Sequence, residues 1–306
     1  MNFIYKAYIQ KLFSTLPKGE KLNYVFQKYV TKSLPILDSD FVIKLEAAKS
    51  HFNNFKKYGS SKNPEDCTYY EFGAGYDMLI PLSMSILGFK KLICIDIREL
   101  IFPELIKDSI NRLRKFKDKL GKEISLSENI PSITGKNYKD ILKKFFRIEY
   151  MAPLDARNTH IEKNSIDFIL SNATMEHIPE NDISPIMKEC YRILTKNGIM
   201  SNVIDYRDHW SFFDSSISVY NYLKFSDNKW LKLNPSIMYQ NRMRHKDYIK
   251  IIKDTGFEIL EETANKPNEK ELDELKNIRL DKDFSNNYSK EELSIKSSIL
   301  VIKKFF

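Results

Sequence analysis

The sequence has few cysteines and no long apolar segment, and each absence excludes a class of protein. The three cysteines, Cys67, Cys94 and Cys190, are scattered along 306 residues. An odd and scattered set argues against a disulfide framework and against a zinc site. No apolar run reaches the roughly 20 residues that span a bilayer, and the first residues, with Lys6 and Lys11 among aromatics, contain no signal-peptide core. We therefore expect a cytoplasmic protein without a transmembrane segment.

The basic residues are in excess but are spread along the chain. Lysine and arginine total 49 against 41 acidic residues, a net charge of +8. A basic balance can indicate binding to nucleic acid or to an anionic membrane. Lysine predominates over arginine throughout, however, which indicates a compositional bias of the whole surface. We therefore expect a small-molecule or glycan substrate and consider a nucleic-acid partner unlikely; no oligomeric state is predicted.

The chain divides into a helical start and a longer α/β region. Residues 1–60 have a helical pattern broken at Pro17 and Pro35, and a polar cluster follows at 60–65. From 61 to 306, apolar segments typical of buried strands alternate with amphipathic segments typical of helices. The expected strands are 68–72, 91–96, 147–151, 166–171, 199–204, 257–261 and 298–303. The expected helices between them are 77–87, 103–120, 138–146, 183–194 and 245–255.

This alternation predicts a doubly wound, mostly parallel sheet with helices on both faces. Right-handed crossovers bring the carboxyl ends of parallel strands to one rim of the sheet, where ligands bind. Polar side chains gather after those expected strand ends: Glu71, Asp96, Asp155, Asn172 and Asp205.

The segment from Tyr69 to Leu82, YYEFGAGYDMLIPL, reads as a strand, a glycine turn and a helix. Gly73 can adopt a positive φ, and Gly75 has no Cβ to obstruct a ligand. The helix behind them offers free N–H groups to an anionic group. Asp96 closes the next expected strand, close to the spacing of about 20 residues at which nucleotide folds place a ribose-binding carboxylate. An ordinary helix N-cap is the alternative role for Asp96.

The glycine turn departs from the dinucleotide pattern G-x-G-x-x-G, because Met78 occupies the third glycine position. Glu71, two residues before Gly73, would repel a pyrophosphate but suits the cationic amino group of a methionine moiety. The order E-x-G-x-G resembles the first motif of the class I S-adenosylmethionine-dependent methyltransferases. Asp77 stands where that family often has a third glycine.

The resemblance continues along the chain and implies the cofactor site. Asp155, in MAPLDARN, matches the acid that accepts a hydrogen bond from the adenine amino group. Asn172 would lie beside the methionine end of the cofactor, and the segment 175–178, MEHI, matches a common family sequence. Residues 187–200 resemble the helix, turn and fifth strand of the same family. The implied cofactor-binding residues are Glu71, Phe72, Gly73, Gly75, Asp77, Asp96, Ile97, Asp155, Ala156 and Asn172.

Polar and aromatic residues crowd together after the fifth expected strand, in IDYRDHWSFFD. Asp205, Asp208 and His209, with His177, could deprotonate or orient an acceptor group. Local contacts or packing would explain the same residues without catalysis. No second cluster of ligands accompanies them, so no metal is predicted.

The expected insert at about 206–244 reads as a substrate lid. Tyr206 and Trp210, followed by Phe212 and Phe213, could stack on a flat ring. The candidates for holding an anionic or hydroxylated substrate are Asn241, Arg242 and Arg244. A solvated basic surface is the alternative for this last group.

The resemblance implies a seven-stranded sheet of order 3-2-1-4-5-7-6 with the last strand antiparallel. It also implies S-adenosyl-L-methionine as cofactor and methyl transfer to oxygen or nitrogen of a small molecule or glycan. Residues 16–35 resemble, less specifically, a leader of bacterial members encoded near surface-glycan genes. The alternatives are an RNA methyltransferase and a catalytically silent module that binds the cofactor.

Overall fold

The computed structural model describes residues 2–59, 62–120 and 129–305. Its centre is a seven-stranded sheet of order β3-β2-β1-β4-β5-β7-β6, which confirms the predicted order. β1 to β5 run parallel, and β7 is antiparallel to both β5 and β6. The strands are β1 (Thr68–Phe72), β2 (Lys91–Ile95), β3 (Ile148–Met151), β4 (Ile166–Asn172), β5 (Leu194–Asp205), β6 (Phe257–Asn265) and β7 (Ser297–Lys304).

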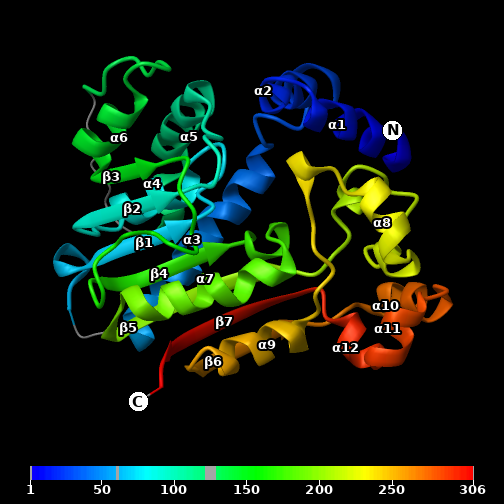
Figure 1. Ribbon diagram of the computed structural model, residues 1–306. Coiled ribbons are helices and arrows are strands. Elements are labelled where there is room, and N and C mark those ends of the chain that lie inside the picture. The colour runs from blue at the N-terminus through cyan, green and yellow to red at the C-terminus, as the bar shows by residue number, and fades with distance from the viewer. Residues whose placement is uncertain (1, 60–61, 121–128, 306) are drawn as a thin grey trace.

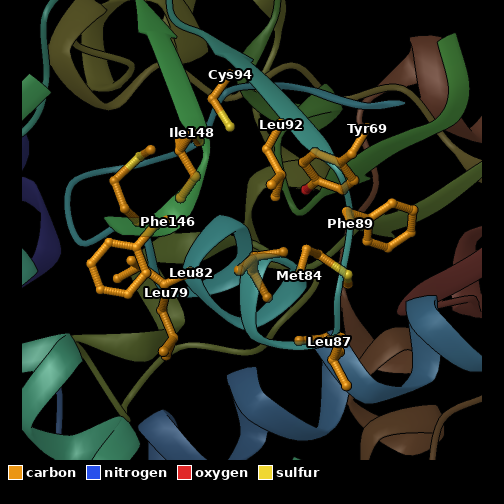
Figure 2. Packing of buried hydrophobic residues seen from close by; sticks show 14 of the residues in the cluster. Tyr69, Leu79, Leu82, Met84, Leu87, Phe89, Leu92, Cys94, Phe146 and Ile148 are labelled. Carbon is orange, nitrogen blue, oxygen red and sulfur yellow. The ribbon is translucent and has the colours of Figure 1, made fainter. Parts of the chain in front are cut away.

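Helices cover both faces of the sheet (Figure 1). One apolar cluster joins the sheet to α3 (Asp38–Tyr58), α4 (Leu79–Ile86), α5 (Pro103–Phe116) and α6 (Tyr138–Phe146). A second cluster joins the opposite face to α7 (Glu180–Ile193) and α9 (His245–Asp254). Figure 2 shows the first cluster, in which Leu79, Leu82 and Met84 of α4 pack among Tyr69, Leu92 and Ile148 of the neighbouring strands. Burial on both faces explains why the strands read as continuous apolar runs.

The turn after β1 shows why α4 begins later than expected. The sequence predicts a helix from residue 77, whereas α4 starts at Leu79. Met78 has a left-handed backbone with φ of 53°, and the Asp77 side chain accepts a hydrogen bond from the Leu79 N–H at 3.1 Å. These two residues therefore complete the turn instead of entering the helix.

The helices of the first 60 residues pack in two different places. α3 belongs to the first apolar cluster on the sheet. In contrast, α1 (Phe3–Thr15) packs against α2 (Gly19–Val25) at the carboxyl-end side of the sheet (Figure 1). α1 also contacts two elements of the insert, α8 (Asp227–Leu233) and the 3-10 helix η7 (Ser236–Met238). The Phe3 N–H donates to Asp214 at 2.9 Å, and Lys11 donates to the Leu231 carbonyl at 2.9 Å. α1, α2 and the insert therefore form a layer over the carboxyl-end rim of the sheet. The division of the chain into two domains at residue 60 stays a prediction.

Three short helices between β6 and β7 were not anticipated from the sequence: α10 (Glu269–Asn277), α11 (Lys282–Asn287) and α12 (Lys290–Ser294). Leu275, Phe284 and Leu293 from these helices join a third apolar cluster with Trp210 and Trp230 of the insert. Within residues 2–59, 62–120 and 129–305, no helix has the length and apolarity needed to cross a membrane.

Candidate functional site

A cavity of about 490 Å³ opens at the carboxyl ends of β1, β2 and β4. Its lining includes Gly73 and Gly75 after β1, Asp96 and Ile97 after β2, and Thr174 after β4. The other side consists of the insert residues Phe212, Phe213 and Ile237 to Tyr239, with Gln27 and Lys44 from the N-terminal helices. This volume is within the range of about 300–1,000 Å³ that is usual for small-molecule and cofactor sites.

The two glycines of the turn have the same backbone conformation but different surroundings. Both have φ of 76°, which an L side chain rarely adopts. A Cβ at Gly73 would lie 2.2 Å from Thr174 Cγ2, whereas a Cβ at Gly75 would meet nothing within 4 Å. The Gly73 N–H donates to the Ile95 carbonyl at 2.8 Å, which joins the turn to the end of β2. Gly73 therefore allows β1 and β4 to approach, and Gly75 leaves space in the cavity.

This difference gives a paired prediction. Gly73→Ala and Gly75→Ala both carry the cost of a left-handed alanine, roughly 1–2 kcal/mol in free energy of unfolding. We expect Gly73→Ala to cost about 1–3 kcal/mol more, because the stiff Thr174 side chain must move. Urea unfolding of the two variants, and of Gly73→Ala combined with Thr174→Ala, measures the difference. Equal stability of the two single variants would contradict the close packing of Gly73 on Thr174.

Asp96 lies in the cavity wall as the sequence predicted, and its carboxylate is largely buried. The side chain is 5% exposed and accepts a hydrogen bond from the Tyr150 hydroxyl at 3.0 Å. Burial raises the pKa of Asp96 to about 7, although Tyr150 and Arg98 act in the opposite direction. The neighbouring Ile97 is exposed and also lines the cavity. A buried carboxylate at the end of β2 is well placed to accept hydrogen bonds from hydroxyl groups of a ligand.

Glu71 lies beneath the turn and does not line the cavity. It is 2% exposed, and the Tyr69 hydroxyl donates to it. Burial raises the pKa of Glu71 to about 8, although the hydrogen bond from Tyr69 lowers it. The predicted contact of Glu71 with a ligand amino group therefore stays a prediction, and the Tyr69 hydroxyl is the partner that the structure shows for this carboxyl.

Two further predicted cofactor residues are committed to protein partners. Asp77 accepts from the Lys44 ammonium at 2.8 Å and caps α4. The Asn172 carbonyl oxygen lies 3.1 Å from His51 Nε2. Neither residue lines the cavity, whereas Lys44 does. No pattern in the sequence indicates Lys44, because its helix precedes the first strand and only the tertiary packing brings it to the rim.

Phe72, Asp155 and Ala156 line the cavity as the sequence predicted. The Asp155 carboxylate accepts from Arg157 at 2.6 Å, and Arg157 also reaches Asp182 at 2.6 Å. Arg157 holds the pKa of Asp155 below its ordinary value. The carboxyl group at this edge of the cavity is therefore ionised and fixed by the arginine.

His177 and His209 face each other across the cavity wall, with ring centroids 4.9 Å apart. His177 Nδ1 lies 2.7 Å from the Tyr239 carbonyl, which makes Nδ1 the donor and leaves Nε2 with a lone pair. The residue is exposed at the cavity, yet many protein atoms surround its ring, and this desolvation, with the neighbouring His209, lowers the pKa of His177 to about 4. His177 is therefore neutral near pH 7 and is a weak base.

Asp205 and Asp208 lie behind the cavity wall. Asp205 forms a two-point ion pair with Arg207, at 2.6 Å for the shorter contact, and its Oδ2 lies 3.7 Å from His209 Nε2. Burial alone would raise the pKa of Asp205, but His209 and Arg207 outweigh it and hold that pKa well below its usual range. Asp208 is fully buried and accepts from the Trp210 N–H and the Asn221 side chain, each at 2.9 Å. Asp208 therefore holds the loop through these hydrogen bonds, and its predicted role as a base stays a prediction.

The five predicted substrate contacts do not line the cavity, because protein groups occupy their side chains. The Arg244 side chain is fully buried and donates to the carbonyls of Tyr206, Leu293 and Ile295. Arg242 donates to the carbonyls of Tyr222 and Phe225 and pairs with Asp227, and Asn241 donates to the carbonyls of Met175 and Ile178. The Tyr206 hydroxyl bonds Ser298, and Trp210 packs in the third apolar cluster. The predicted substrate role of these five residues gains no support from the cavity lining and stays a prediction.

Comparison with known proteins gives one sequence match. Residues 132–201, which include β3, β4, α7 and most of β5, match the sequence model of a methyltransferase domain family. No curated protein matches the chain.

Solved structures of related shape include a methyltransferase dependent on S-adenosylmethionine from Methanosarcina mazei, with 16% identity over 82% of this chain and 97% of that chain and a TM-score of 0.45. A phosphoethanolamine N-methyltransferase from Haemonchus contortus has 15% identity over 83% and 52% of the two chains and a TM-score of 0.43. A geranyl diphosphate C-methyltransferase from Streptomyces coelicolor is 12% identical, and the alignment covers 89% of this chain and 86% of that chain with a TM-score of 0.46. All three TM-scores are below 0.5, and the match to the methyltransferase domain model covers residues 132–201 only.

Proposed function

We propose that the chain is a class I S-adenosylmethionine-dependent methyltransferase, and that it methylates oxygen or nitrogen of a small molecule or glycan held in the cavity at the strand ends. The observation that carries this proposal is the convergence of the glycine turn, Asp96 and Asp155 on one cavity. The three segments come from β1, β2 and β3, which are adjacent in the sheet.

The residues at this rim fit S-adenosylmethionine. Asp96 offers a carboxylate for the ribose hydroxyls, and Gly75 leaves open space where a side chain would otherwise stand. Leu154 and Ala156 provide an apolar surface for the adenine beside the carboxylate of Asp155. When bound, the cofactor supplies an activated methyl group and its own leaving group, so the protein mainly has to align the acceptor.

The methyl acceptor would bind on the side of the cavity that the insert forms. Phe212, Phe213, Ile237, Met238 and Tyr239 form a wall that is mostly apolar and aromatic. Such a wall favours an acceptor with a flat or apolar part. His177 Nε2 lies at this wall with a lone pair and can accept a hydrogen bond that orients a hydroxyl or amine of the acceptor.

Transfer of label tests the proposal. Purified protein is incubated with methyl-labelled cofactor and either a metabolite and glycan extract or an RNA fraction of the same lysate. We expect label in the first fraction only, and less label with Asp96→Ala when the cofactor concentration is below saturation. Label in RNA that disappears after ribonuclease treatment would support the RNA alternative, and cofactor binding without label in any fraction would support the silent module.

A further inference from the structure

Three side chains that could bind a metal ion lie close together at this cavity: His177 and His209, which line it, and the buried Glu176, which does not. One ligand atom from each residue lies within 4.8 Å of the other two. Glu176 and His177 belong to the 3-10 helix η4 (Met175–His177) after β4, and His209 begins η5 (His209–Phe212) after β5. Because β4 and β5 pair in parallel, their carboxyl ends bring the two short helices together.

Glu176 is the unusual member of the cluster. Its side chain is 1% exposed, and neither carboxylate oxygen has a hydrogen-bond partner among the described residues. Arg207, whose charge also acts on Glu176, is already paired with Asp205. A buried carboxylate without a partner is costly, and native proteins compensate such groups with hydrogen bonds, with counter-charges, with a metal ion or with a proton. Burial raises the pKa of Glu176 well above its ordinary value, so a proton occupies this carboxyl unless a cation takes its place.

The two histidines are oriented as ligands. Donation from His177 Nδ1 to the Tyr239 carbonyl directs the lone pair of Nε2 away from the backbone, which is the usual arrangement behind a metal-bound imidazole. His209 Nε2 is buried and has no hydrogen-bond partner among the described residues. Asp205 lies 3.7 Å from that nitrogen and accepts from Arg207, so it adds negative charge beside the cluster.

We propose that Glu176, His177 and His209 bind a divalent first-row transition-metal ion. Two imidazoles and one carboxylate suit zinc, iron or manganese, and three protein ligands leave positions for a further ligand. Ligands about 2.1 Å from one ion lie roughly 3–4 Å apart, so the cluster has to contract slightly on binding. Both histidines line the cavity, and the open positions therefore face its interior.

The ion would lie where it can bind and orient the methyl acceptor, a role that rests on the proposed methyl transfer. A hydroxyl or carboxylate oxygen of the acceptor would take an open coordination position, which fixes the acceptor beside the cofactor half of the cavity. A bound cation also favours loss of a proton from a coordinated hydroxyl, with His177 and His209 then acting as ligands instead of bases. The metal-binding step itself does not depend on this role.

Metal titration tests the proposal. The full chain is stripped with a chelator and titrated with Co²⁺, which is followed by visible absorption, and Zn²⁺ is then added as a competitor. We expect the chain to bind one equivalent of Co²⁺ with the visible absorption bands typical of a Co²⁺ ion of low coordination number. Added Zn²⁺ should displace the Co²⁺ and remove these bands. Glu176→Gln and His209→Asn should each weaken binding by about tenfold or more. His160→Asn, at an exposed histidine outside the cluster, should leave binding unchanged.

Failure of the wild type to bind one equivalent of Co²⁺ or Zn²⁺ would overturn the proposal, as would equal binding by all three variants. Circular dichroism of each variant separates lost ligands from lost fold, and the wild-type stoichiometry decides the matter even if a variant does not fold. Titration of the same samples with S-adenosylhomocysteine keeps the two claims apart. Cofactor binding without metal binding would refute the metal site alone.

Discussion

Asp96→Ala is expected to weaken binding of S-adenosylhomocysteine by about 1–3 kcal/mol, through loss of charge-assisted hydrogen bonds to the ribose. Asp96 is the carboxylate at the end of β2 that faces the cavity. Isothermal titration calorimetry measures the change. Asp66→Ala removes the same charge from an exposed position before β1 and serves as the matched control, with affinity expected to equal that of the wild type. Equal affinities for all three proteins would contradict the assignment of Asp96.

The same carboxyl gives a pH dependence with a definite sign. Burial raises its pKa from the ordinary value of 3.8 to about 7 in the free protein. Ligand binding that uses the ionised form should therefore strengthen as pH rises through this range, and Asp96→Asn should remove that dependence. Between pH 3.8 and about pH 7, Asp96 keeps its proton in the folded protein but loses it in the unfolded chain. The contribution of Asp96 to stability therefore falls as the pH rises from about 4 to 7. Glu71, with its pKa raised from 4.5 to about 8, acts in the same direction.

Arg244→Met is expected to lower the free energy of unfolding by about 3 kcal/mol or more. The fully buried guanidinium donates to three backbone carbonyls and to the Tyr222 hydroxyl. Methionine retains much of the volume but leaves these buried acceptors without a donor, and each lost hydrogen bond to a charged group costs about 1.5–3 kcal/mol before any rearrangement. Urea unfolding measures the loss.

Arg279→Met, at an exposed position, is the control and should change stability by less than about 0.5 kcal/mol. Calorimetry with the methyl acceptor, once it is identified, separates the two interpretations of Arg244. A variant that keeps its stability but loses acceptor affinity would place Arg244 in the substrate site.

The sheet could be predicted from the sequence because its strands are buried on both faces and read as apolar runs between helical periods. The alternation also fixes which strand ends meet at the rim, and Asp96 and Asp155 were found for this reason. The sequence could not show how Glu71 is placed, because a carboxylate two residues before the first glycine can line the cavity or be buried among protein atoms. In the structure Glu71 is buried and does not line the cavity.

The insert was the least predictable region. A polar side chain in a loop looks the same in sequence whether it binds a ligand or a backbone carbonyl, and Asn241 and Arg244 bind carbonyls. These carbonyls need partners because the insert is buried beneath α1 and the helices that follow β6. The pairing of His177 with His209 was equally hidden, since it depends on the parallel alignment of β4 and β5.

The most direct test of the account is a crystal structure of the protein with S-adenosylhomocysteine. We expect the ligand in the cavity after β1, β2 and β4, with both ribose hydroxyls within hydrogen-bonding distance of the Asp96 carboxylate and the adenine against Leu154 and Ala156. A ligand bound elsewhere, or a cavity filled by protein side chains in every crystal form, would contradict the account.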